Sequence, residues 1–227
     1  MTWVKVCGIK TVHDALAVSR AGVAAVGLNM FSRSKRFIDT HNARSISMAL
    51  AEACPNVGRV GVLVDLEGGV GSYMEVGRKA LLTHLQLHGD ESEEMVEELC
   101  DRGWSVIKAI RVRTGEDADD VSEQIDAYLD ATDGRCQILL DAHISGKRGG
   151  TGRRIDVPLL RELLSRYPLI VAGGLTPTNV ADILKLAPLS DGKTPGITGV
   201  DVASGVEGPN GRKDIMLVRR FMAATRI

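Results

Sequence analysis

The chain has 227 residues, of which 44% are hydrophobic and 25% charged, a composition typical of a soluble globular protein with a sizeable core. Its net charge of −1 excludes a global field that would recruit nucleic acid or an anionic membrane, so neither is expected as a partner. Lys5, Lys10, His13 and Asp14 interrupt any signal-peptide run, and no apolar run reaches membrane-spanning length, so we expect a cytoplasmic protein.

Short apolar runs alternate with amphipathic stretches along the whole chain. The runs are rich in Val, Ile and Leu, as is typical of parallel strands that are covered on both faces. The predicted strands are Trp3–Ile9, Ala24–Met30, Gly58–Val64, His84–Leu87, Ser105–Ile110, Cys136–Asp141, Leu169–Ala172 and Ile197–Val202. Apolar residues at helical spacing predict helices between them, most clearly within 91–103, 117–131, 158–164 and 180–187.

Several helix ends carry sequence signals. Thr11 followed by Asp14 resembles a capping box that opens the first helix. Glu91–Glu94 is predicted as an acidic first turn, and Gly103 as the C′ glycine of the same helix. Thr176-Pro177 is predicted as an N-cap and a first helical position.

Eight strand–helix pairs of about 28 residues each have the count and scale of a (β/α)8 barrel, which we predict as one α/β domain over residues 1–227. The alternative is an open doubly wound sheet, which usually carries G-x-G-x-x-G after its first strand. This chain has Cys7-Gly8-Ile9-Lys10 there, and no linker or low-complexity tract divides it. The four cysteines are scattered without a C-x-x-C pair, so free thiols are expected and a zinc site is not.

Two strand-to-glycine turns lie in the last quarter of the chain. Gly173-Gly174 follows one predicted strand, and Ser204-Gly205 follows the next. Glycine lets the backbone approach a ligand closely, and the N–H groups at a helix start suit an anion. One double glycine is an ordinary turn in most proteins. Two such turns on neighbouring units predict a phosphate cradle.

Polar residues follow most of the predicted strands, at the barrel face where such folds carry their chemistry. They are Cys7, Arg33, Lys35, Arg36, Asp65, Gln86, His88, Lys108, Arg111, Arg113, Asp141, Lys147 and Arg148. Many are basic although the whole chain is nearly neutral, which favours a substrate with more than one negative group. Ordinary solvated loop charge is the alternative for each of them.

Two of these residues are candidates for acid–base work. Cys7 lies two residues after Lys5, so both side chains point the same way, into the barrel. A buried structural thiol is the alternative to a thiolate base that the ammonium stabilises through a lowered pKa. Asp141 is either a helix cap or an acid whose pKa burial raises. His88 could also be an acid or base, but we interpret it as packing the turn, and Trp3 as lying at the opposite end of the barrel.

Several motifs occur in a fixed order along the chain. They are Lys5-Val6-Cys7-Gly8-Ile9, Ser34-Lys35-Arg36-Phe37-Ile38, Val60-Gly61-Val62-Leu63-Val64, Leu85-Gln86-Leu87-His88-Gly89-Asp90-Glu91, Leu139-Leu140-Asp141, Gly149-Gly150-Thr151-Gly152, Ala172-Gly173-Gly174-Leu175, Val200-Asp201-Val202-Ala203-Ser204-Gly205-Val206-Glu207 and Lys213-Asp214. Together they resemble the phosphoribosylanthranilate isomerase family, (β/α)8 enzymes of the ribulose-phosphate-binding type that act in tryptophan biosynthesis.

The resemblance implies an Amadori rearrangement of a phosphorylated aminosugar, with no metal or other cofactor, in a monomer or homodimer. It implies these roles: general base Cys7, general acid Asp141, anthranilate-carboxylate partner Arg36, a further substrate-binding residue Asp201, and a phosphate cradle of Gly173, Gly174, Ser204 and Gly205. Three departures from the family pattern stand out. Asn29-Met30 replaces an aromatic-rich run, Ala203 replaces a commoner serine, and the longer segment 190–196 is expected to alter the rim.

Three other functions stay open at this point. A histidine-pathway isomerase uses the same chemistry but has aspartate at the position of Cys7. A related synthase or lyase barrel would carry a lysine acid or paired carboxylates, for which this chain shows no counterpart. A phosphosugar-binding regulatory protein would need neither Cys7 nor Asp141, so their presence argues against it.

Overall fold

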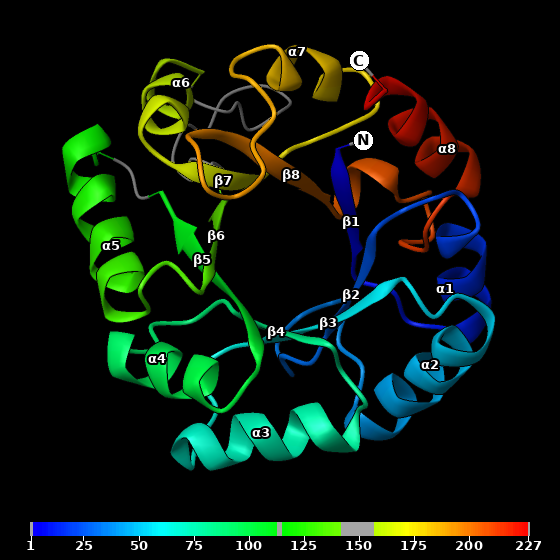
Figure 1. Ribbon diagram of the computed structural model, residues 1–227. Coiled ribbons are helices and arrows are strands. Elements are labelled where there is room, and N and C mark those ends of the chain that lie inside the picture. Colours follow the sequence, from blue (N-terminus) through cyan, green and yellow to red (C-terminus); the bar gives the residue numbers. More distant parts are fainter. Residues whose placement is uncertain (1, 113–114, 142–156, 227) are drawn as a thin grey trace.

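The computed structural model of the protein describes residues 2–112, 115–141 and 157–226. Eight parallel strands close into a barrel in sequence order, with β1 hydrogen-bonded to β8. The strands are β1 Trp3–Cys7, β2 Ala25–Asn29, β3 Gly58–Leu63, β4 His84–Leu87, β5 Ser105–Arg111, β6 Gln137–Asp141, β7 Pro168–Ala172 and β8 Gly196–Val202. Figure 1 shows the strands as an inner ring inside a ring of helices. The predicted barrel and its eight strands are therefore confirmed.

The helices follow the strands in alternation. They are α1 Val12–Ser19, α2 Thr40–Ala53, α3 Gly69–Lys79, α4 Glu93–Asp101, α5 Ala118–Ala131, α6 Val157–Arg166, α7 Val180–Leu184 and α8 Ile215–Ala224, with a 3-10 turn, η1, at Ser204–Val206. Figure 1 shows the N- and C-terminal ends of the chain near each other, beside β1 and α8. The Thr2 hydroxyl donates to the Thr225 carbonyl there. Within the described part of the chain, no helix combines the length and the apolar character that crossing a membrane requires.

The core has two layers, as the alternation of side chains along each strand requires. Most buried apolar residues fill the space between the strands and the surrounding helices. A smaller cluster fills the barrel interior: Ala25, Val60, Ile107, Ala109, Leu139, Ile170 and Ala172. Trp3 packs against this cluster from the first residue of β1, as predicted. The interior of the barrel is therefore a packed core rather than a pore.

Two of the predicted helix ends are confirmed, and a third is wrong. Thr11 caps α1, its hydroxyl accepting from the Asp14 N–H, and Gly103 takes a positive φ of 83° after α4. Helix α7, however, begins at Val180, so Thr176 is not its N-cap. The side chain of Asn179 accepts from the Thr176 N–H at 2.7 Å and forms a turn before the helix.

Two further expectations need correction. Helix α4 begins at Glu93 after the N-cap Ser92, and Glu91 lies before it with its side chain buried. The segment 190–196 leads into β8 and therefore lies at the N-terminal end of the barrel strands, opposite the rim that their C-terminal ends form. The predicted effect of this segment on the rim is wrong for that reason.

Candidate active site

Cys7 ends β1 with its thiol facing the barrel interior. The residue is only 8% exposed, and a Cβ placed on Gly27 of β2 would lie 2.6 Å from its sulfur. Glycine at position 27 therefore makes the room in which the thiol sits. Burial raises the pKa of the Cys7 thiol, and the Lys5 ammonium only partly offsets that rise. The predicted net lowering of this pKa is wrong, because desolvation outweighs the cation.

Lys5 forms a buried ion pair directly beneath Cys7. Its side chain is fully buried, and Nζ donates to Asp201 Oδ2 at 2.7 Å, across the β1–β8 register in which the two residues are partners. Burial alone would lower the pKa of Lys5, but the charges of Asp201 and Cys7 outweigh it and raise that pKa. Lys5 is thus held as a cation. Among the described residues, Asp201 Oδ1 has no hydrogen-bond partner.

Asp141 ends β6 and shares the barrel mouth with His88. The Asp141 Oδ2 and His88 Nε2 atoms are 3.7 Å apart, and about a quarter of each side chain is exposed. The His88 Nδ1 atom lies 3.0 Å from the Gln86 amide nitrogen. Our interpretation of His88 as a turn-packing residue is therefore wrong, because the alternation of β4 continues past Leu87 and turns the ring inward. Within the described chain, Asp141 Oδ1 accepts no hydrogen bond.

Arg36, from the loop after β2, is held by a carboxylate rather than by solvent. Its Nε and Nη2 donate to Glu207 Oε1 and Oε2 at 2.6 and 2.9 Å. The Arg36 side chain crosses over Gly8, where an added Cβ would lie 2.3 Å from Arg36 Cδ and where φ is +84°. Gly8 thus allows Arg36 to reach the space beside Cys7.

Glu207 also accepts from the ammonium of Lys213 at 2.9 Å, and the same ammonium donates to the Ala203 carbonyl at 2.9 Å. Burial opposes ionisation of Glu207, but the hydrogen bonds and charges of Arg36 and Lys213 lower its pKa to about 2. Glu207 is therefore an anion between two cations at neutral pH.

The two predicted phosphate turns lie against each other. Gly173 and Gly174 adopt positive φ angles of 93° and 64°, which side chains rarely accept. An added Cβ on Gly205 would lie 1.9 Å from the Leu175 carbonyl oxygen, so the loops after β7 and β8 are packed together there. The glycine-rich Gly149-Gly150-Thr151-Gly152 segment lies outside the described residues, as do Arg113, Lys147 and Arg148.

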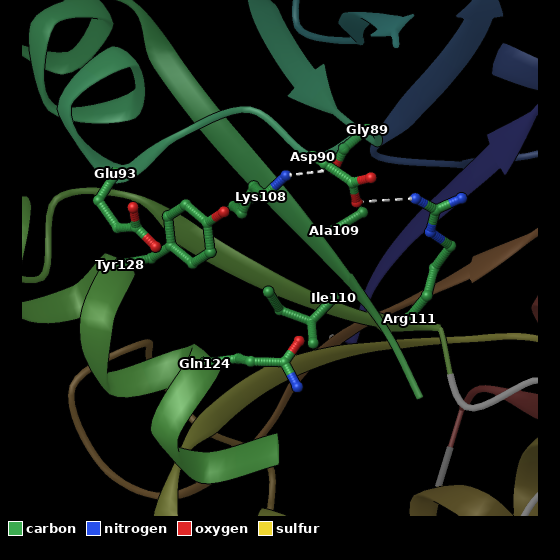
Figure 2. Close-up of a pocket in the computed structure, with 9 residues that line it drawn as sticks. All are labelled: Gly89, Asp90, Glu93, Lys108, Ala109, Ile110, Arg111, Gln124 and Tyr128. Carbon is green, nitrogen blue, oxygen red and sulfur yellow. Dashed lines mark hydrogen bonds and ion pairs between the residues drawn. The ribbon is translucent and has the colours of Figure 1, made fainter. Parts of the chain in front are cut away.

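Lys108 does not belong to the basic rim that the sequence predicted. Ile107 and Ala109 face the barrel interior, so Lys108 between them faces the helices. Its ammonium donates to Glu91 Oε2 at 2.8 Å and to the Gly89 carbonyl at 2.7 Å. Figure 2 shows this ammonium directed at Gly89, with the Tyr128 ring nearby. Lys108 therefore ties the loop after β4 to β5.

The remaining rim residues divide between exposed and structural positions. Arg33 and Lys35 are exposed, and Arg111 pairs with Asp90 on the surface (Figure 2). Asp65 accepts from the Asp90 N–H at 2.7 Å. Asn29 accepts from a backbone N–H two residues later. In the described ranges, no group of three or more His, Cys, Asp or Glu side chains is placed to hold a metal ion, and the four cysteines are free thiols.

Sequence reasoning assigned no role to Gly27, Glu207 or Lys213. Gly27 carried a usable signal, because a glycine inside a strand often marks a close approach of another group. Glu207 and Lys213 lay within family motifs, but their pairing with Arg36 depends on loops that meet only in the folded chain.

Comparison with known proteins shows which family has this sequence and fold. The model of the N-(5′-phosphoribosyl)anthranilate isomerase family matches residues 4–224. The isomerase of that name from Rubrobacter xylanophilus is 41% identical over 227 residues and covers 100% of both chains. The crystal structure of phosphoribosylanthranilate isomerase from Thermotoga maritima superposes with a TM-score of 0.79 at 32% identity, over 100% of this chain and 99% of that one.

A further crystal structure shows a phosphoribosylanthranilate isomerase in complex with reduced 1-(o-carboxyphenylamino)-1-deoxyribulose 5-phosphate. It is 31% identical to this chain, has a TM-score of 0.78 and covers 100% of this chain and 99% of that one.

Proposed function

This chain belongs to the N-(5′-phosphoribosyl)anthranilate isomerase family and is an isomerase of tryptophan biosynthesis, and from that premise we propose that Cys7 is its general base and Asp141 its general acid. One observation carries the proposal. Cys7 and Asp141 are the last residues of β1 and β6, their side chains point into the same end of the barrel, and the Lys5 cation lies beneath Cys7. The family match and the relatives favour this activity over the histidine-pathway isomerase considered above.

The reaction converts an aminoaldose phosphate into an aminoketose phosphate. Asp141 gives its proton to the ribose ring oxygen, and the ring opens to a protonated Schiff base. The Cys7 thiolate then removes the proton from C2 of the sugar, and the electron pair of that C–H bond moves toward the imine nitrogen. The resulting enolamine tautomerises to the ketone. The protonated imine accepts the electron pair, so the sequence of steps balances without an external oxidant or reductant.

Arg36 is assigned to the substrate carboxylate. A guanidinium has five N–H donors in a planar fork, and Glu207 takes the edge formed by Nε and Nη2. The edge formed by Nη1 and Nη2 remains to match a second carboxylate with two parallel hydrogen bonds. Asp201 Oδ1, buried without a partner among the described residues, is assigned to a polar group of the sugar.

The phosphate is assigned to the adjoining turns at Gly173-Gly174 and Ser204-Gly205. Their contact leaves no room for a side chain at position 205, and Gly173 and Gly174 have positive φ angles, which supports a site built from backbone N–H groups. Ala203 offers no hydroxyl there, and its carbonyl accepts from Lys213.

The test is to follow the fluorescence of phosphoribosylanthranilate as the Cys7→Ala and Asp141→Asn variants consume it. Each substitution should lower kcat by about 10²–10⁴ with KM nearly unchanged, because a proton-transfer group stabilises the transition state and not the bound substrate. Circular dichroism checks that each variant is folded. Turnover of a folded variant within a few-fold of the parent would show that the role assigned to that residue is wrong.

A further inference from the structure

The loops after β2 and β8 meet in a row of three charged side chains, Arg36, Glu207 and Lys213. We propose that Glu207, itself fixed by Lys213, is the positioning residue that aims the Nη1–Nη2 edge of Arg36 at the substrate carboxylate and thereby sets the enzyme's preference for carboxylate-bearing ligands. This inference rests on the assignment of that carboxylate to Arg36 made above.

The contacts between Arg36 and Glu207 fix the guanidinium plane. Two parallel bonds of 2.6 and 2.9 Å join one edge of the guanidinium to both oxygens of the carboxylate. Such a two-pronged contact removes rotation about the end of a long, flexible side chain. Among the described residues, no group takes the Nη1–Nη2 edge of Arg36, and the direction of that edge therefore depends on the position of Glu207.

Glu207 is itself held firmly from the other side. The Lys213 side chain is 1% exposed, and its ammonium donates both to Glu207 Oε1 and to the Ala203 carbonyl at 2.9 Å. The backbones of Glu207 and Lys213 also form an antiparallel bridge. A carboxylate anchored by a buried cation and by its own backbone is a fixed reference for Arg36.

The charge of the three groups favours a second anion. One carboxylate lies between two cations, so the row carries a formal charge of +1 beside Cys7. Solvent reaches only 19% of the Arg36 side chain, which limits the screening of that charge by water. A ligand carboxylate at the available edge completes an alternating arrangement of charges, whereas a ligand without one leaves the cation uncompensated.

The experiment measures the dissociation constants of two reduced product analogues by calorimetry: the carboxyphenylamino compound and its phenylamino counterpart, which lacks the carboxylate. The parent should prefer the carboxylate-bearing analogue. Glu207→Gln replaces one acceptor by a donor that opposes Nη2, and it also raises the formal charge of the row to +2. If Glu207 acts by orienting Arg36, the substitution should still reduce that preference about tenfold, which is 1.4 kcal/mol, while the phenylamino analogue binds within about threefold of the parent. A preference that rises with the added charge would overturn the positioning role. A change that merely loosened the fold would weaken both analogues together.

Glu98→Gln is the matched control, because Glu98 accepts two hydrogen bonds from Arg102 on the exposed face of α4. It should leave both affinities unchanged. Arg36→Met separates the two proposals: if it keeps the parent's preference, the carboxylate assignment itself is wrong. If Arg36→Met abolishes the preference and Glu207→Gln keeps it, the positioning role is overturned and the assignment to Arg36 stands. Should Glu207→Gln not fold, Glu207→Asp, which draws the carboxylate back by one methylene, gives the same comparison.

Discussion

Replacing Lys5 by methionine should raise the pKa of the Cys7 thiol and slow the enzyme at neutral pH. Lys5 is a fully buried cation beneath Cys7, and its ammonium acts against the rise in the pKa of Cys7 that burial causes. In Lys5→Met the thiol keeps the burial and the nearby Asp201 carboxylate but loses the cation. Loss of an opposite charge at this range raises a thiol pKa by about 1–3 units.

The size of the effect on rate follows from the thiolate fraction. Because the pKa of Cys7 lies above neutrality, each further unit lowers the thiolate fraction at pH 7 about tenfold. The expected loss in kcat/KM at about pH 7 is therefore roughly 10- to 1000-fold. The limb of the pH–rate profile that reports the thiol should move to higher pH by the same number of units.

The measurements are the pH dependence of kcat/KM and the ultraviolet absorbance of the thiolate, with Cys7→Ala used to subtract the other thiols. Lys79→Met, which removes a cation from the exposed Glu75 pair on α3, is the control and should leave the profile unchanged. If Lys5→Met leaves Asp201 unpaired and unfolds the chain, Lys5→Met with Asp201→Asn is compared with Asp201→Asn alone, because the Asp201 charge itself raises the pKa of Cys7. A folded variant lacking Lys5 whose thiol titrates as in its counterpart that keeps Lys5 would refute the reasoning.

Three other changes test the site. Arg36→Lys should raise KM between roughly tenfold and a hundredfold, since a charge-assisted hydrogen bond of about 1.5–3 kcal/mol is lost. Lysine has no planar fork with which to bind two carboxylates at once. An unchanged KM would place the substrate carboxylate elsewhere. Gly174→Leu should weaken phosphate binding, measured by calorimetry, more than Gly134→Leu, which has a similar positive φ in open space; equal effects would contradict the cradle. The Glu207 carboxyl, with a pKa of about 2 against an ordinary 4.5, stabilises the fold above about pH 4.5 and loses that stabilisation as the pH falls toward 2. Between about pH 6 and pH 3, urea unfolding of Glu207→Gln should therefore lose roughly 2 kcal/mol less stability than the parent, and equal losses would count against the ion pair.

The barrel could be predicted from the sequence because its strands are short, apolar and regularly spaced. Each predicted strand lies within two residues of the observed one at both ends, and β4 agrees at both. The predicted helix starts are wrong where a polar side chain that could cap or begin a helix makes a different contact instead. Glu91 is of a residue type common in the first turn of a helix, but its carboxylate forms a buried ion pair with Lys108, and α4 begins two residues later. Thr176 has the type of an N-cap, but its hydroxyl lies 3.0 Å from the Thr178 hydroxyl, and α7 begins only at Val180.

The same distinction separates the parts of the site that could be predicted from those that could not. Cys7 and Asp141 are short side chains on strands, so alternation along the strand already fixes which way they point. Arg36, Glu207 and Lys213 are long side chains on loops, and Glu207 is 171 residues from the partner it holds. Their contacts depend on how the loops after β2 and β8 pack against each other, which the local sequence does not determine. The direction of a short side chain on a strand can therefore be predicted from the local sequence. The direction of the Arg36 side chain depends on the position of Glu207, and a sequence motif gives the type of that residue but not its contact with Arg36.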